Sequence, residues 1–120
     1  MRRHSILYIL LFFLVTSCAG PKPLYTWGSK KKFNYYSASY NYLKKSDEKS
    51  INKLKESYID IIANQKGTRK TVPPGIYADY GFLLLSLDEA DKGNEMLKKE
   101  IELYPESEVF ISRILNMLNE

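Results

Sequence analysis

The chain has 120 residues, enough for one small domain, and its 44% hydrophobic and 27% charged residues are an ordinary balance for a globular protein. Its formal net charge is +4, and 16 basic residues remain against 14 acidic ones once Arg2 and Arg3 at the start of the chain are set aside. The remaining charge of +2 is too small, and the basic residues are too scattered, to indicate a protein that binds nucleic acid.

The start of the chain has the layout of a secretory signal. Arg2 and Arg3 give a positive start, residues 6–15 are an unbroken run of ten apolar side chains, and the small residues Thr16 and Ser17 follow. Ten residues span about 15 Å as a helix, roughly half of a hydrocarbon core, so a permanent transmembrane helix is not expected. The sequence therefore predicts a cleaved signal peptide over residues 1–17.

The end of that signal, Val15-Thr16-Ser17-Cys18, resembles the bacterial lipobox of an aliphatic residue, two small residues and a cysteine. The resemblance implies transfer of a diacylglyceryl group to the Cys18 thiol, cleavage between Ser17 and Cys18, and acylation of the new amino terminus. A lipid thioether also explains a single cysteine in an exported chain; the alternative is an ordinary signal with an incidental cysteine. The residue directly after the cysteine is Ala19 and not aspartate. This resembles the sorting signal of enteric bacteria that implies an outer-membrane lipoprotein facing the periplasm. We expect no cofactor besides this covalent lipid.

Residues 18–32 are predicted to be the lipidated N-terminus and tether, because residues 20–23 (GPKP) cannot continue a helix. The tether carries Tyr25 and Trp27, for which two alternatives stand. They pack back onto the domain, which we favour, or they lie at the membrane interface or in a partner-binding patch. The lysines at 30–32 are expected to be solvated or to meet anionic lipid headgroups.

Residues 33–120 are predicted to form an all-α domain. Apolar residues recur in this region at the spacing of an amphipathic helix, and no segment alternates with period two, so no sheet is expected. The predicted helices cover residues 33–45, 46–66, 76–86, 89–104 and 106–118.

Local signals predict where these helices begin and end. Ser46 is the expected N-cap ahead of two acidic residues, and Gly67 is the expected C-terminal stop. Two capping boxes are candidates near residue 89: Ser86 with Glu89, and Asp88 with Asp91. The apolar face of the last helix is expected to comprise Phe110, Ile114, Met117 and Leu118, widened by Ile111 and Leu115.

Residues 74–107 resemble one tetratricopeptide repeat, a helix pair of about 34 residues. The residues that carry the resemblance are Tyr77, Tyr80, Gly81, Leu84, Gly93, Leu97 and Pro105. Gly81 and Gly93 are expected to let two helix backbones approach, whereas Glu100 departs from the pattern, which usually has alanine there. A single helix pair cannot bury its apolar face alone, so flanking helices are expected to complete a short helical array.

Over nearly all of the mature chain, the sequence resembles an uncharacterised family of small bacterial lipoproteins, domain-of-unknown-function family 4810. The resemblance rests on residues 25–28 (YTWG), 72–81 (VPPGIYADYG) and 104–107 (YPES), with Val109 and Phe110. It implies an envelope lipoprotein with no assigned reaction. Family members are often encoded beside a lipoprotein similar to the curli-export pore, which implies a partner of that kind in an outer-membrane assembly.

Catalytic and metal-binding chemistry is not expected. The mature chain has no histidine and no second cysteine, which removes Ser/His/Asp and Cys/His arrangements and the usual zinc sites. The acidic residues at 88, 89 and 91 are explained by a helix N-terminus. We therefore expect no enzyme activity, no metal ion and no small-molecule substrate.

Two functions remain. In the first, the chain is a lipid-anchored, non-catalytic protein–protein interaction module with Phe82 as the apolar anchor of its groove. The expected groove residues are Ala78, Phe82, Leu85 and Ser86; the alternative is that Phe82 and Leu85 are buried under the 46–66 helix. In the second, the chain is a structural subunit of an envelope complex, and Tyr25 and Trp27 at the membrane make the main contact.

Overall fold

A computed structural model of the chain describes residues 20–29 and 35–118. The predicted signal peptide over residues 1–17, the lipid-bearing Cys18 with its cleavage site after Ser17, and the lysines at 30–32 lie outside the described residues. The described part is all-α, as the sequence predicts, and contains no strand. Its elements are α2 (Tyr35–Lys45), α3 (Glu48–Ala63), α4 (Ile76–Ser86), α5 (Ala90–Leu103), the short 3-10 helix η1 (Pro105–Ser107) and α6 (Glu108–Leu118).

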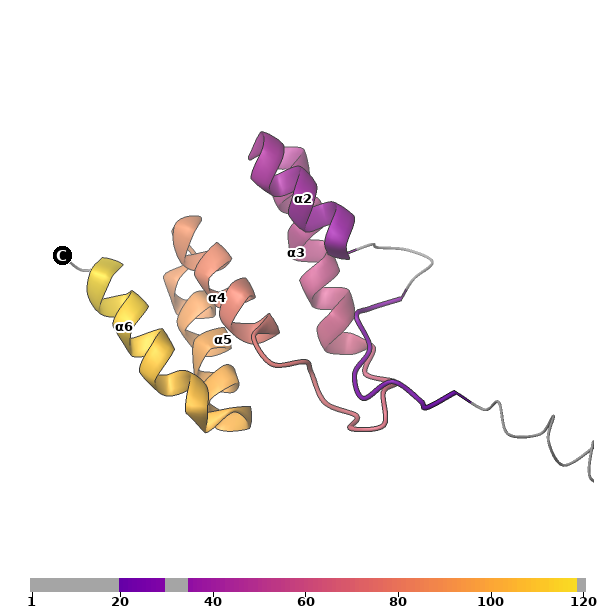
Figure 1. The fold of residues 1–120 in the computed structure, drawn as a ribbon. Coiled ribbons are helices and arrows are strands. Elements are labelled where there is room, and N and C mark those ends of the chain that lie inside the picture. Colours follow the sequence, from indigo (N-terminus) through magenta and orange to yellow (C-terminus); the bar gives the residue numbers. More distant parts are fainter. Residues whose placement is uncertain (1–19, 30–34, 119–120) are drawn as a thin grey trace, which may run out of the picture.

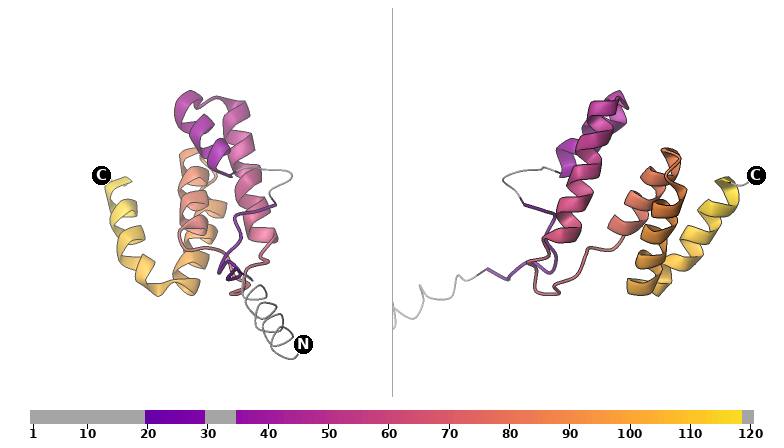
Figure 2. Two further views of the ribbon diagram at one scale, coloured as in Figure 1. Left: turned by 45° about the vertical axis from the view of Figure 1, so that its right-hand side comes forward. Right: turned by 180° about the vertical axis from the view of Figure 1, so that it is seen from behind.

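The helices are arranged as two hairpins and a closing helix (Figures 1 and 2). Helices α2 and α3 lie side by side, and so do α4 and α5, while α6 lies on the side of the second hairpin that faces away from α2 and α3. Residues 64–75 cross between the hairpins without regular structure. Of the described helices, none is long and apolar enough to cross a membrane.

Two apolar clusters hold this arrangement together. The first joins α2 and α3 to α4 and consists of Ala38, Leu54, Tyr58, Ile61, Val72, Ile76 and Leu83. The second joins α4, α5 and α6 and consists of Ala78, Leu97 and Ile111, with Phe82, Leu85, Ile101 and Leu115 packed against it. Helix α4 contributes to both clusters, so it is the central helix of the molecule.

The start of α3 differs from the predicted cap. Asp47, not Ser46, is the N-cap, and its side chain accepts a hydrogen bond from the backbone N–H of Ser50 at 2.8 Å. Ser46 adopts a positive φ of 48° and donates its hydroxyl to the carbonyl of Tyr42 at 3.0 Å, so it belongs to the end of α2. Helix α3 also ends earlier than predicted, at Ala63, which leaves Gly67 outside the helix end.

The hairpin of α4 and α5 is packed as its two glycines predict. A Cβ on Gly81 would lie 2.9 Å from the backbone oxygen of Gly93 and 2.8 Å from the Leu97 side chain. Neither predicted capping box forms, because α5 begins after Glu89 without a side-chain cap and the Ser86 hydroxyl donates instead to the carbonyl of Leu83 at 2.7 Å. The backbone thus turns from α4 to α5 through its own hydrogen bonds.

Glu100 has a structural reason to differ from the alanine of the repeat pattern. Its side chain is fully buried, and Oε1 accepts the backbone N–H of Gly75 at 2.7 Å and the Ser107 hydroxyl at 3.5 Å. The Tyr104 hydroxyl donates to the carbonyl of Val72 at 2.6 Å nearby. The C-terminal end of α5 therefore fixes the turn that precedes α4.

Helix α6 is rotated relative to the predicted apolar face. Ile111 is the fully buried residue, whereas Phe110 is 58% exposed and Met117 and Leu118 are exposed as well. Because η1 intervenes, α6 begins at Glu108 rather than at residue 106. The pair Ile111 and Leu115, four residues apart, faces the second cluster, so the residues expected only to widen the apolar face are the ones that pack.

Candidate functional site

The N-terminal strap, defined here as residues 23–29, lies against the end of α3 and the loop that follows it. The Thr26 hydroxyl donates to the carbonyl of Asn64 at 2.7 Å and accepts the backbone N–H of Lys66 at 3.0 Å. A Cβ on Gly67 would lie 2.3 Å from the backbone oxygen of Leu24. Gly67 therefore allows the strap to approach the loop and does not end a helix, which corrects the predicted stop.

Both aromatic residues of the strap contact the domain. The Arg69 guanidinium lies over the Tyr25 ring at 5.8 Å from its centroid, a cation–π contact. The Trp27 ring stacks on Tyr35 of α2 at a centroid distance of 5.8 Å, yet Trp27 remains 41% exposed. Next to it, Gly28 has a φ of +80°, a left-handed conformation that glycine adopts without strain. The strap is thus attached to the fold and still presents one aromatic face.

A row of aromatic rings in contact runs from the strap to the second hairpin. Trp27 contacts Tyr35, Tyr35 contacts Tyr58 of α3 at 5.6 Å, and Tyr58 contacts Tyr80 of α4 at 5.4 Å between ring centroids. Burial, and next the neighbouring Tyr35, raise the pKa of Tyr58 well above its usual value. The row ties the strap and both hairpins into one aromatic framework.

A groove with a volume of about 390 Å³ opens beside this row, between the first hairpin and α4. Among the described residues, its walls are mostly aromatic or aliphatic, its hydroxyl groups come from serine and tyrosine, and its one acidic residue is Asp79. The lining residues are Tyr35, Ser39, Tyr42, Leu43, Leu54, Tyr58, Asp79, Phe82, Leu83 and Ser86. Such a groove combines apolar contact area with a few polar groups, as ligand sites do.

Two polar groups in the groove lack partners within the described part of the chain. The Ser39 hydroxyl is buried and makes no hydrogen bond there. The Asp79 side chain has no hydrogen bond or ion pair with a described residue. Residue 79 lies at the exposed rim, but burial of the carboxyl group, and next the charge of Glu100, raise the pKa of Asp79. Unpartnered polar atoms of this kind are usually satisfied by water or by a ligand.

The four predicted groove residues separate into two pairs. Phe82 and Ser86 line the groove, and Phe82 also packs against the second cluster. Ala78 and Leu85 do not line it: Ala78 is buried with Leu97, and the Leu85 side chain lies 2.9 Å from the position of a Cβ on Gly93. Both therefore belong to the packing around α5. The alternative that Phe82 and Leu85 are buried under α3 is also incorrect, because both side chains are only half-buried and both pack against the second cluster.

On α4, the sequence interpretation missed the groove residues Asp79 and Leu83. Together with the predicted Phe82 and Ser86 they follow helical spacing, at i, i+3, i+4 and i+7 for residues 79, 82, 83 and 86. The spacing of the α2 residues is similar, at 35, 39, 42 and 43. This spacing was visible in the sequence, but nothing local indicated that these two helices face the same groove.

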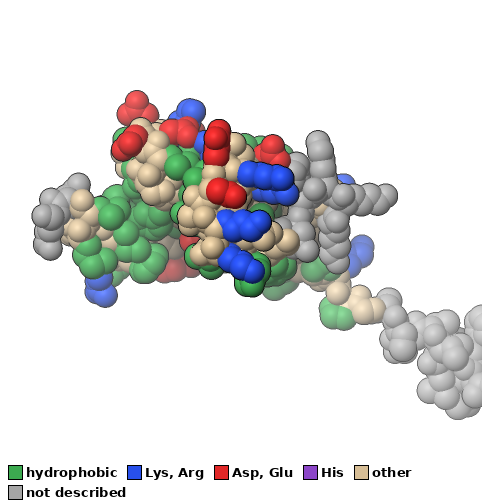
Figure 3. Space-filling view, turned by 90° about the horizontal axis from the view of Figure 1, so that it is seen from above, with side chains coloured by type: hydrophobic (Ala, Val, Ile, Leu, Met, Phe, Trp, Pro, Cys, Tyr) green, Lys and Arg blue, Asp and Glu red, His purple; other side chains and the backbone are tan. Residues whose placement is uncertain are grey.

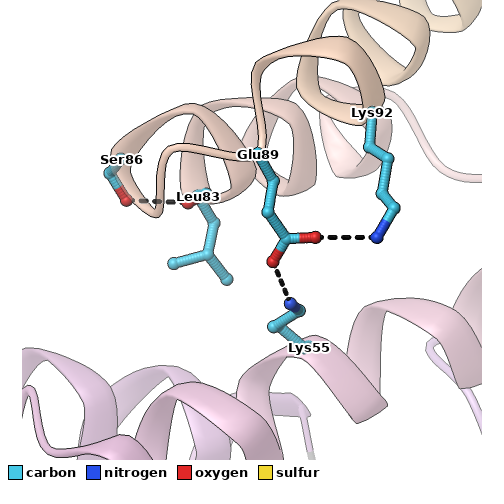
Figure 4. Close-up of polar contacts among 5 residues, drawn as sticks. All are labelled: Lys55, Leu83, Ser86, Glu89 and Lys92. Atoms are coloured by element: carbon cyan, nitrogen blue, oxygen red, sulfur yellow. Dashed lines mark hydrogen bonds and ion pairs between the residues drawn. The ribbon is translucent and has the colours of Figure 1, made fainter.

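An ion-pair bridge connects the two hairpins near the groove (Figure 4). Lys55 of α3 extends to Glu89 at the start of α5, with 2.5 Å between Nζ and Oε1, and Lys92 binds the other carboxylate oxygen at 3.0 Å. Hydrogen bonds from Lys55 and Lys92 hold the pKa of Glu89 below its ordinary value. Both lysine ammonium groups thus have a carboxylate partner other than Asp79.

Charged and hydrophobic side chains are distributed unevenly over the outer surface. Seen from above, lysine and arginine side chains gather beside the first hairpin, and hydrophobic side chains cover the α6 end (Figure 3). The exposed apolar residues of α6 are Val109, Phe110, Met117 and Leu118. Within residues 20–29 and 35–118, no group of three or more Asp, Glu, His or Cys side chains could hold a metal ion.

The fold and its groove define a class: a small all-α protein of two helix hairpins and a closing helix, with an aromatic groove between the hairpins. The chain belongs to the family of the domain of unknown function DUF4810, whose model matches residues 24–114. The match begins in the strap and ends within α6, so it includes every residue that lines the groove. Neither the search of curated proteins nor that of solved structures found a match.

Proposed function

We propose that this chain is a lipid-anchored, non-catalytic module of the bacterial cell envelope that binds a protein partner in the groove between its hairpins. The observation that carries the proposal is the groove itself, which is open, aromatic and supplied with polar groups that have no partner in the described chain. Tyrosine side chains are frequent in binding surfaces because they offer a large rigid area with a polar tip.

The architecture supports a binding role for this groove. The α4–α5 pair has the glycine contact at the positions that resemble a tetratricopeptide repeat, a fold whose stacked helix pairs form extended binding surfaces. In this proposal, the first hairpin is a degenerate unit, α6 closes the array, and a peptide segment of the partner contacts Phe82 and the tyrosines.

The proposed anchor is the lipid on Cys18. Acyl chains there would hold the module at a membrane, and Ala19 favours the outer membrane with the domain facing the periplasm. The partner that we propose is an envelope protein, and the family resemblance favours a lipoprotein similar to the curli-export pore. No reaction, metal ion or small-molecule substrate is part of this proposal.

Site-specific photocrosslinking in intact cells tests the groove. A photoreactive benzoyl-phenylalanine replaces Leu43 or Ser86, both exposed residues of the groove, or replaces Asn94 or Asn116, exposed residues of α5 and α6 that do not line it. We expect one discrete crosslinked product from the groove positions and none from the two controls. Equal products from all four positions, or none from the groove, would contradict the proposal.

A second candidate function is the structural subunit whose main contact is the strap, and the exposed faces of Leu24 and Trp27 favour it. The Cys18→Ser variant, exported without lipid, separates the two. If the groove still crosslinks the partner, binding resides in the module. If crosslinking disappears although the variant is folded and abundant in the periplasm, the membrane-bound subunit is the better description.

A further inference from the structure

The groove carries negative charge, from Asp79, without a positive charge to balance it among the described residues that line it. Of these described residues, Asp79 is the only acidic one, and none is a lysine or an arginine. The two lysines of the ion-pair bridge between the hairpins, Lys55 and Lys92, are both bound to Glu89. An occupant that brings a positive charge would therefore meet an unpaired carboxylate, whereas an anionic occupant would be repelled.

The groove also presents aromatic rings in the neighbourhood of that carboxylate. Tyr58 and Asp79 line the same groove, and Tyr35 and Tyr42 complete the wall formed by the first hairpin. Tyrosine faces attract cations, and the attraction increases when water is excluded. Carboxylate and rings together suit one chemical group, a cationic side chain.

The unpartnered Ser39 hydroxyl fits the same occupant. It is buried, and it lines the groove on α2 while Asp79 lines it on α4. An ammonium or guanidinium group offers several N–H donors, and both the carboxylate and the serine oxygen accept them. The apolar residues Leu43, Phe82 and Leu83 provide contacts for the aliphatic stem and for apolar neighbours in the partner.

We propose that the groove recognises a lysine or arginine side chain of the partner, flanked by apolar residues, and that Asp79 and the tyrosine rings bind its cation. This inference rests on the proposed function and specifies its ligand chemistry. A negatively charged lipid headgroup is the opposite of what the groove fits, and an uncharged apolar segment would leave Asp79 unpaired.

Selection from a phage library of random heptapeptides tests the inference without a known partner. The full lipidated chain is presented in phosphatidylcholine nanodiscs, and empty nanodiscs remove peptides that bind lipid. Asp79→Asn is compared with Asp91→Asn, a matched control because Asp91 is also an exposed aspartate in the first turn of its helix and lies outside the groove. We expect peptides with a basic residue beside apolar ones to be enriched on the wild type and on the control, but not on Asp79→Asn.

A double-mutant cycle then measures the interaction itself. A selected peptide is compared with its copy in which norleucine replaces the lysine, or an uncharged side chain of similar length replaces an arginine, and binding is followed by the emission of Trp27, which stacks on the groove residue Tyr35. The wild type should bind the charged peptide about tenfold more tightly, consistent with one partly desolvated cation–π and ion-pair contact. The Asp79→Asn variant should discriminate much less.

The outcomes separate the two proposals. Enriched peptides without basic residues, or basic peptides that bind Asp79→Asn as well as the wild type, would overturn this inference and leave the groove as a binding site of different specificity. No enrichment on any of the folded proteins would count against the groove as a peptide site and therefore against the proposed function too.

Discussion

The two hairpins of this molecule are built in different ways. In the α4–α5 hairpin, Gly81 and Gly93 bring the helix backbones together, and Leu84 and Leu97 are almost completely buried. In the α2–α3 hairpin, α2 buries only Ala38 among its residues and leaves a row of large apolar residues open to solvent. Those exposed residues are Tyr36, Tyr40 and Leu43.

This difference separates stability from recognition. Where α4 meets α5, the second hairpin is packed as the interior of a larger protein is, with Leu84 and Leu97 enclosed by their neighbours. The first hairpin makes a ring contact with the strap through Tyr35, and Tyr35, Tyr42 and the exposed Leu43 line the groove. A tightly packed half can thus hold Asp79 and Phe82 in place while the more open half offers area to a partner.

The largest effect is expected from breaking the tight hairpin, with Gly81→Val. A branched side chain would meet the Gly93 backbone oxygen, which cannot move aside, at the 2.9 Å contact of its Cβ. Replacing glycine in a helix gains at most about 1 kcal/mol of propensity, whereas overpacking costs about 1–3 kcal/mol or more, so the clash decides the sign. We expect the free energy of unfolding in urea, followed by circular dichroism, to fall by about 2–3 kcal/mol.

Gly20→Val is the matched control for that experiment. No atom lies within 4 Å of a Cβ at Gly20, so the same substitution should leave the free energy of unfolding unchanged. If Gly81→Val were as stable as this control, the close approach of α4 and α5 would not be a source of stability, and the contrast between the hairpins would lose its basis.

The tight half is also the half that the sequence predicted best. The bounds of α4 agree with the prediction at both ends, because residues 72–75 are a local start signal and the glycine spacing is local as well. The N-cap residue of α3 could not be predicted from local sequence signals alone. Ser46 and Asp47 are both good N-caps, and the choice depends on how the chain leaves α2.

The groove was predictable only in part, for a reason that lies in α4. Its sequence, IYADYGFLLLS, is apolar around most of its circumference, so periodicity could not tell which side faces which neighbour. Of the residues expected to share one face of α4, Phe82 and Ser86 line the groove and Leu85 does not. The role of Gly67 was not predictable for a related reason. Its contact, Leu24, lies 43 positions earlier in the chain, and only the fold brings the two residues together.

A smaller effect is expected from loosening the open half through Thr26→Val. The substitution keeps the shape of the side chain and removes the two hydrogen bonds to Asn64 and Lys66. Since these groups are partly exposed and water can replace the hydroxyl, we expect a loss of about 1 kcal/mol in the free energy of unfolding. Trp27 should become more accessible to quenching by acrylamide, because the strap carries it.

Thr68→Val provides the comparison, since its hydroxyl makes only a long 3.4 Å contact with the carbonyl of Pro23 at an exposed position. Its stability and its Trp27 quenching should match the wild type. Equal behaviour of the two variants would mean that the strap is not held by Thr26, and the open hairpin would then rely on its ring contacts alone.

The smallest effect concerns the join between the halves, tested with Lys55→Met. The bridge to Glu89 is partly exposed, so the free energy of unfolding should fall less than in Thr26→Val, and the difference from wild type should shrink in 1 M salt, where the Debye length is about 3 Å.

The bridge should also depend on pH. Because Lys55 and Lys92 lower the pKa of Glu89 in the folded state, the bridge stabilises the fold at pH values above the ordinary pKa of 4.5. This contribution is lost as the pH falls through the lowered pKa. Urea denaturation at pH 7 and pH 3 measures that loss, with Glu95→Gln as the control for an ion pair inside one helix. A difference between Lys55→Met and wild type that was the same at pH 7, at pH 3 and in 1 M salt would come from the packing of the lysine stem, and the two hairpins would then be joined by apolar contact and not by charge.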